Sequence, residues 1–188
     1  MQQVSDTYVC EYEVKRSTFT SYLLPYSRFE STLTTLKKEH PKASHIVWAY
    51  RVLNAYGQIT ENSTDDGEPK GCAGNPTLAQ MRGYDLIESA LITVRYFGGI
   101  KLGTGGMVRA YSSAAKAVIT SAQMTPFEKR EPYTMEVAYA LLKRYEHFLQ
   151  THAIEIGART FEADRVVWRL QLTQEERRRL EAFRASLL

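Results

Sequence analysis

An acidic loop carries the first residues of this sequence whose types and spacing could do chemistry. Asp65, Asp66 and Glu68 place three carboxylates within four residues of the segment 65–76. Carboxylate oxygens are the ligands that hard cations such as Mg²⁺ prefer, and they also attract a basic partner. The spacing does not match a calcium EF-hand, so no particular metal follows. The alternative is a solvated turn in which Asp and Gly supply the backbone geometry.

A glycine-rich loop carries the second group of residues. The segment 97–109 reads FGGIKLGTGGMVR and lies between an apolar run and an alanine-rich run. Backbone N–H groups and the helix dipole at such an entry to a helix favour an anion. The spacing matches neither the P-loop nor the dinucleotide fingerprint. The alternative is a tight strand-to-helix crossover in which the glycines serve packing.

Basic and aromatic side chains gather around the glycine-rich loop. Basic groups beside aromatic rings suit contact with an RNA backbone combined with stacking of bases, and here Tyr96 is expected to stack. Scattered surface charge is the alternative. The residues expected to bind an anion or nucleic acid are Arg82, Arg95, Tyr96, Lys101, Gly103, Thr104, Gly105, Gly106 and Arg109.

The composition sets limits on the class of protein. The chain has 188 residues, a net charge of +3, 44% hydrophobic residues and 24% charged residues, which is the balance of a globular protein. No stretch approaches the ~18 apolar residues of a membrane span, and the N-terminus lacks the pattern of a secretory signal. Two cysteines are too few for a disulfide framework. We therefore expect a cytoplasmic protein.

The distribution of glycine and proline divides the chain into two domains. Nine of the eleven glycines fall between Gly67 and Gly106. The polar segment 125–132, bracketed by Pro126 and Pro132, is typical of a linker. We expect domains at 1–126 and 133–188 in a mixed α+β protein.

The first domain is expected to contain five strands and three helices. The first helix should start with a capping box at Ser27–Glu30 and end near Glu39, before Pro41. The expected strands are 8–14, 18–24, 45–53, 58–61 and 90–97, and the expected helices are 29–39, 77–84 and 107–121.

The second domain is expected to follow the order strand, helix, strand, strand, helix. Thr173 and Glu176 have the spacing of a second capping box, which opens the last helix. The order lacks only a final strand to make a ferredoxin-like unit. The expected strands are 133–141, 154–161 and 165–172, and the expected helices are 143–151 and 175–186.

These motifs together resemble one known family. The segment 63–74, STDDGEPKGCAG, and the segment 94–106, VRYFGGIKLGTGG, are similar to the long motifs of the YigZ/IMPACT family. The segments 13–19, EVKRSTF, and 45–50, HIVWAY, resemble its N-terminal signatures. The resemblance covers nearly all of the first domain, and the second domain resembles the small C-terminal domain of bacterial members in element order and length.

The resemblance implies a fold and a general role. It implies that the first domain has the β/α fold shared by a ribosomal-protein domain, elongation factor G domain IV and GHMP-type kinases. It implies a ferredoxin-like second domain similar to the last domain of elongation factor G. Eukaryotic IMPACT members act in translational control through a protein partner, whereas binding to nucleic acid or the ribosome is the usual proposal for bacterial members.

Three hypotheses of function follow. The first is a non-catalytic protein that binds RNA or the ribosome and affects translation, with no cofactor. The second is a hydrolase or transferase that uses Asp65, Asp66 and Glu68 with Mg²⁺ and the glycine-rich loop for a phosphorylated substrate. The third is an interaction module whose acidic loop binds a translation factor. The sequence establishes no catalytic constellation and no oligomeric state.

Overall fold

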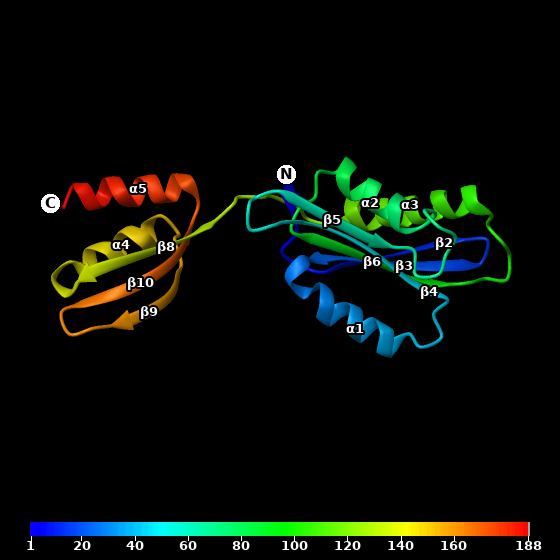
Figure 1. Cartoon of the computed structure of the whole chain (residues 1–188), viewed down its shortest axis with the longest axis horizontal. Coiled ribbons are helices and arrows are strands. Elements are labelled where there is room, and N and C mark those ends of the chain that lie inside the picture. Colours follow the sequence, from blue (N-terminus) through cyan, green and yellow to red (C-terminus); the bar gives the residue numbers. More distant parts are fainter. Residues whose placement is uncertain (188) are drawn as a thin grey trace. The chain divides into compact units, whose positions relative to one another are not determined.

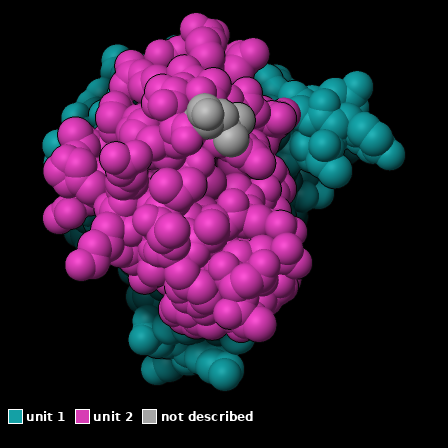
Figure 2. Space-filling view, turned by 90° about the vertical axis from the view of Figure 1, so that its left-hand side faces the viewer, with its two compact units in different colours: residues 1–127 teal, residues 128–188 magenta. Residues whose placement is uncertain are grey.

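The computed structural model describes residues 1–187 and divides the chain into two compact units, Met1–Phe127 and Glu128–Leu188 (Figures 1 and 2). Both units combine helices with antiparallel sheets, so the expected mixed α+β class is confirmed. The segment 125–132 is more ordered than a linker. Thr125–Pro126 forms strand β7, which pairs with β1 (Gln2–Gln3), and Glu131 already begins strand β8. Within the segment 125–132, only residues 127–130 lie outside a strand.

Unit 1 is built around a five-stranded antiparallel sheet in the order β2-β3-β6-β4-β5. Helix α1 covers one face of this sheet, and helices α2 and α3 cover the other (Figure 1). The strands are β2 (Tyr8–Val14), β3 (Ser17–Pro25), β4 (His45–Leu53), β5 (Ile59–Thr64) and β6 (Ser89–Tyr96). The helices are α1 (Phe29–Glu39), α2 (Gly74–Gly83) and α3 (Thr104–Ser121).

The central strand β6 shows how the two faces are filled. Side chains alternate across a strand. Ile92 and Val94 therefore pack with Phe29 on the α1 face, whereas Leu91 packs with Val118 on the α2/α3 face. Because both faces of the sheet are covered, seven of the eight residues of β6 are buried, including the polar Ser89, Thr93 and Arg95.

The helix starts in unit 1 differ from those expected, and α2 begins at Gly74 rather than at residue 77. The capping box expected at Ser27–Glu30 is wrong, because a 3₁₀ turn at Tyr26–Arg28 leads directly into α1 and Arg28 is its N-cap. Helix α3 begins at Thr104 rather than at residue 107, so Thr104, Gly105 and Gly106 are helical. Pattern reasoning placed them in the loop because glycine disfavours a helix interior.

Unit 2 contains a three-stranded antiparallel sheet in the order β8-β10-β9, covered by two helices. Residues 139–141 form a 3₁₀ turn rather than the end of a strand. The capping box between Thr173 and Glu176 is confirmed. The elements are β8 (Glu131–Ala138), α4 (Leu142–Thr151), β9 (Ile156–Phe161), β10 (Arg165–Leu172) and α5 (Gln174–Ala185).

The core of unit 2 gathers around Trp168, which is fully buried against Tyr145 and Leu180. This core is separate from the clusters of unit 1. None of the helices described over residues 1–187 is both long and apolar enough to cross a membrane.

Candidate nucleic-acid interface

The glycine-rich loop is held against the turn of the β2–β3 hairpin. Lys15 and Arg16 form this turn with positive φ values of 47° and 62°. A Cβ on Gly98 would lie 2.0 Å from the Arg16 carbonyl carbon, so only glycine permits this approach. The Gly98 N–H also donates to Ser17 Oγ at 3.1 Å. The turn and the loop therefore lie together, at the end of unit 1 away from the N-terminus (Figure 1).

The N-terminus of helix α3 lies in the same region. Gly103 is its N-cap, with a φ of 74°, and its carbonyl accepts the Met107 N–H at 2.9 Å. Within residues 1–187, no side chain caps this helix and its first turn carries no acidic residue. Because the first N–H groups of a helix have no partner inside it, those of Thr104, Gly105 and Gly106 can face an anion.

Four exposed cations lie on the segments that meet near this helix start, and we call them the basic rim. They come from the hairpin turn, from the glycine-rich loop and from the second turn of α3. The Arg109 guanidinium folds back along its helix, with Nη1 3.7 Å from the position of a Cβ on Gly105. The basic rim consists of Lys15, Arg16, Lys101 and Arg109.

Arg95 lies beneath the basic rim rather than on it. Its side chain is 6% exposed and forms an ion pair with Glu68, whose side chain is 3% exposed. Tyr111 donates to Glu68 Oε1 at 2.8 Å. Burial raises the pKa of the Tyr111 hydroxyl above its usual range, and the Glu68 charge raises it further, so Tyr111 stays a neutral donor. Arg95 is thus neutralised within the fold.

The Arg95 guanidinium is also held between two aromatic rings. Its Cζ lies 5.4 Å from the centre of the Phe19 ring and 5.8 Å from that of the Phe97 ring. Its Nε is buried and has no hydrogen-bond partner among residues 1–187. Arg95, paired with Glu68 and in contact with both rings, therefore stabilises the start of the glycine-rich loop at Phe97.

Asp65 closes the acidic loop from inside. Its carboxylate accepts the N–H groups of Gly71 at 2.7 Å, Ala73 at 3.0 Å and Gly74 at 2.9 Å. Burial alone would raise the pKa of Asp65, but these three donors outweigh it and lower the pKa. Since Gly74 is the first residue of α2, Asp65 also supplies the negative charge that this helix start favours.

The other two carboxylates of the acidic loop are bound as well. Asp66 Oδ2 accepts the Ile46 N–H at 2.6 Å, and the Asp66 carbonyl accepts from His45 Nδ1 at 2.7 Å. Glu68 is occupied by Arg95 and Tyr111. Over residues 1–187, no three His, Cys, Asp or Glu side chains are grouped so that they could hold a metal ion.

The structure does not bring Arg82 and Tyr96 to the basic rim. Arg82 pairs with Glu61, which lies opposite Arg51 on β4. Arg95 lies opposite His45, which is six residues before Arg51 on the same strand. At about 3.3 Å per residue, this separates the two sites by roughly 20 Å. Tyr96 faces α1, on the other side of the sheet from Arg95, and its hydroxyl lies 2.9 Å from His40 Nδ1.

The remaining expected residues do come together. Lys101, Arg109 and the first turn of α3 lie at one helix start. Sequence reasoning missed Lys15 and Arg16, which the hairpin brings to the same place. The available signal was two basic residues between two β-like runs, but the contact with Gly98 is set by tertiary structure.

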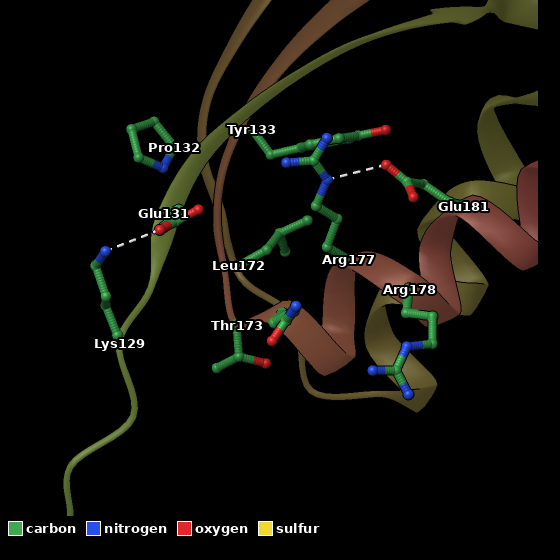
Figure 3. A pocket seen from close by; sticks show the side chains of 10 residues that line it. Lys129, Glu131, Pro132, Tyr133, Leu172, Thr173, Arg177, Arg178 and Glu181 are labelled. Carbon is green, nitrogen blue, oxygen red and sulfur yellow. Dashed lines mark hydrogen bonds and ion pairs between the residues drawn. The ribbon is translucent and has the colours of Figure 1, made fainter.

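A hollow in unit 2 is another place where cations gather. It has a volume of about 570 Å³ and lies between the start of β8 and α5 (Figure 3). Lys129 pairs with Glu131 across it, and Arg177 pairs with Glu181 while stacking on Tyr133 (Figure 3). Since these cations are neutralised by neighbouring carboxylates, this hollow is a weaker anion site than the basic rim.

Comparison with known proteins defines the family. The family model described as the Impact N-terminal domain matches residues 15–119. An "IMPACT family member" of Haemophilus influenzae is 33% identical over 159 residues, covering 83% of this chain and 77% of that protein. "IMPACT family member YigZ" of Escherichia coli is 34% identical over 145 residues, covering 73% of this chain and 69% of that protein. The chain therefore belongs to the IMPACT family.

A solved structure shares the fold of the whole chain. It is described as the crystal structure of "an hypothetical protein" and is 27% identical in sequence. It matches with a TM-score of 0.73 and covers 99% of this chain and 91% of that chain.

Proposed function

We propose that this protein is a cytoplasmic, non-catalytic RNA- or ribosome-binding protein that acts in the regulation of translation. Membership of the IMPACT family supports the role in translation. The observation that carries RNA binding is the basic rim near the start of α3, which no side chain of residues 1–187 caps and whose first turn carries no acidic residue. Exposed cations position a phosphate backbone, and backbone N–H groups at a helix start bind one phosphate.

We also propose domain types for the two units. Unit 1 is assigned to the β/α type shared by a ribosomal-protein domain, elongation factor G domain IV and GHMP-type kinases. Unit 2 is assigned to the ferredoxin-like type, which its strand order β8-β10-β9 and its βαββα sequence support.

The proposal includes no metal and no other cofactor. The acidic loop has a structural role in it, since Asp65 binds three backbone N–H groups and Glu68 is buried against Arg95. The glycine-rich loop contributes the binding surface, and the acidic loop fixes its base.

The test is the salt dependence of RNA binding. If Lys15, Arg16, Lys101 and Arg109 each neutralise one phosphate, log K should fall against log salt with a slope of about −0.7 × 4, or roughly −3, for a single strand. The measurement is fluorescence anisotropy of a labelled 12-nucleotide oligouridine at several KCl concentrations. Replacing Lys101 with Ala should make the slope shallower by about 0.7.

Two control variants separate this site from general surface charge. Lys116 is an exposed lysine on α3, about two turns beyond Arg109, and Arg82 lies at the other end of the sheet. Neither Lys116→Ala nor Arg82→Ala should change the slope. Equal effects of Lys101→Ala and Lys116→Ala would contradict a specific interface, as would the absence of binding at low salt.

A protein partner is the second candidate function. Three apolar side chains near the basic rim are exposed: Phe97 by 49%, Ile100 by 43% and Val108 by 38%. Exposed apolar side chains that gather at one place mark interaction sites. In this alternative, a translation factor covers them, and the acidic loop takes part with its exposed Asp66.

A further inference from the structure

We propose that Phe97 is a stacking platform for an unpaired base, so that the ligand of this site is single-stranded RNA rather than a duplex. This inference rests on the proposed function, because it adds a base contact to the phosphate contacts of the basic rim. It replaces Tyr96, which the sequence favoured for stacking, with the neighbouring residue.

Exposure distinguishes the two aromatic residues. The Phe97 side chain is among the exposed large hydrophobic residues, at 49%, on the strand-to-helix loop. Tyr96 is half-buried against α1, and its hydroxyl lies 2.9 Å from His40 Nδ1. A base could reach Tyr96 only after that contact broke, whereas Phe97 already faces solvent.

The backbone that carries the Phe97 ring is held in place, which lowers the entropy cost of stacking. The Phe97 N–H donates to Ser44 Oγ at 3.0 Å, and the next residue, Gly98, is fixed against the hairpin turn. The inner side of the ring lies over the Arg95 guanidinium, 5.8 Å from its Cζ. An aromatic ring with a buried cation on one side and solvent on the other presents a preorganised surface to a base.

The buried Arg95 adds an observation that points to a ligand above it. Its side chain is 94% buried, and its Nε has no hydrogen-bond partner among residues 1–187, although Glu68 binds Nη1. A nucleotide on Phe97 would place an electron-rich base over this charge. Its phosphates would lie towards Lys101 and the start of α3 at Thr104, which follow Phe97 by four and seven residues.

Charge complementarity favours RNA over an apolar protein surface. The exposed apolar side chains are interleaved with the cations of the basic rim, as Lys101 follows Ile100 and Arg109 follows Val108. Lysine is depleted from the cores of protein interfaces, whereas cations beside aromatic rings are the usual composition of single-strand binding sites. A base in a duplex is already stacked and cannot lie on Phe97.

The experiment compares single-stranded and duplex RNA by fluorescence anisotropy at low salt. The probes are a labelled 12-nucleotide oligoadenosine and a labelled 12-base-pair RNA duplex. Phe97→Ala should weaken binding of the single strand by about 5- to 150-fold, which corresponds to a stacking contribution of about 1–3 kcal/mol. The salt slope should remain unchanged, and Phe97→Tyr should bind as the wild type does. Tyr96→Ala is the matched control, because it removes the neighbouring ring, and it should bind normally.

A second variant reports stacking directly. Phe97→Trp keeps an aromatic ring, so its indole fluorescence should be quenched by the single strand and not by the duplex at equal occupancy. This measurement remains informative if Phe97→Ala exposes Arg95 and lowers stability.

The failures of the two proposals are distinguishable. If Lys101→Ala makes the salt slope shallower but Phe97→Ala binds the single strand normally, the proposed function stands and the stacking platform is overturned. If the wild type binds the duplex as tightly as the single strand, the preference for unpaired bases is overturned. If neither RNA binds at low salt, both proposals fail and the protein partner becomes the better explanation.

Discussion

Glu68 illustrates how a residue with catalytic character can serve the fold. Three groups meet at its carboxylate: Arg95 and Tyr111 bind Oε1, and His45 Nε2 lies 3.6 Å from Oε2. A buried charge is tolerated only when it is paired and hydrogen-bonded. Glu68 therefore joins the acidic loop, the end of β6 and helix α3 through one side chain.

Replacing Glu68 with Gln is expected to destabilise unit 1 strongly. The variant keeps the shape of the side chain but leaves Arg95 as an uncompensated buried charge. Breaking a buried ion pair in this way costs about 3–5 kcal/mol. The free energy of unfolding of unit 1, from urea titration followed by circular dichroism, measures the effect.

Tyr111→Phe is the control for this variant. It removes one hydrogen bond to a charged group and leaves the ion pair intact, so its cost should be smaller, about 1.5–3 kcal/mol. A Glu68→Gln variant as stable as the wild type would show that the pair contributes nothing to the fold.

Asp65 gives unit 1 a stability that depends on pH. Its folded-state pKa is lowered, so its contribution is complete above the unfolded pKa of about 3.9 and is lost as the pH falls through the folded value. Asp65→Asn should therefore have a constant deficit in stability above about pH 5. That deficit should shrink as the pH falls below about 4.

Thermal unfolding of wild type and Asp65→Asn between pH 7 and pH 2.5 measures this difference. Asp164→Asn, at an exposed position in unit 2, serves as the control and should leave unit 1 unchanged throughout. A deficit of Asp65→Asn that persists undiminished at the lowest pH would show that its charge is not the cause.

The residue types of the candidate site could be read from the sequence, but their environments could not. Arg95, Lys101 and Arg109 are equal cations in a pattern, and only the fold buries the first and exposes the others. Likewise, Tyr96 and Phe97 are both aromatic, but the pleat of β6 turns Tyr96 towards α1. Side-chain direction at the end of a strand depends on where the strand stops, which pattern reasoning fixes only within a few residues.

At the scale of elements, the contact between the glycine-rich loop and the β2–β3 turn should be sensitive to one methyl group. A Cβ on Gly98 would overlap the Arg16 carbonyl group, whereas one on Gly99 would meet no atom within 4 Å. Gly99 has a φ of +83°, so Gly99→Ala should cost about 1–2 kcal/mol through backbone strain alone.

Gly98→Ala should cost more than Gly99→Ala, because the backbone of the hairpin turn must move. Overpacking a tight contact costs about 1–3 kcal/mol even where side chains can adjust, and here the obstacle is backbone. Urea unfolding of the two variants decides the point. The NMR amide signals of Lys15 and Arg16 should shift in Gly98→Ala and stay in place in Gly99→Ala.

Element types were more predictable than element ends. The strands β2, β4 and β10 have the bounds expected from their alternating or apolar patterns. The start of α2 was missed, because the cap comes from Asp65, nine residues before Gly74, rather than from a residue next to the helix. Local patterns report local caps such as that of Thr173, and not caps supplied by a distant side chain.

At the scale of the whole molecule, a fragment of residues 1–127 is expected to fold alone. Unit 1 has its own core on both faces of its sheet. The segment between strand β7 of unit 1 and strand β8 of unit 2 is only residues 127–130. The heat-induced unfolding temperature of the fragment should lie close to that of unit 1 in the full chain. Scanning calorimetry compares the two.

Limited proteolysis gives the complementary measurement. Cleavage in the full chain should begin at Lys129 or Arg130, and a fragment of about the size of unit 1 should persist. Primary cleavage at Lys101 would instead indicate that the glycine-rich loop opens more easily than the connection between the units.

The pairing of β1 with β7 has a consequence for how unit 1 could be rearranged. Gln2–Gln3 lies beside Thr125–Pro126, and the Phe127 N–H donates to the Met1 carbonyl at 3.0 Å. The first and last residues of unit 1 are therefore neighbours. A module of this kind can be spliced into a surface loop of a host protein, or circularly permuted through a short peptide that joins residues 127 and 1. New ends opened at the β4–β5 hairpin, where Tyr56 is 88% exposed, would leave the basic rim and its helix start intact.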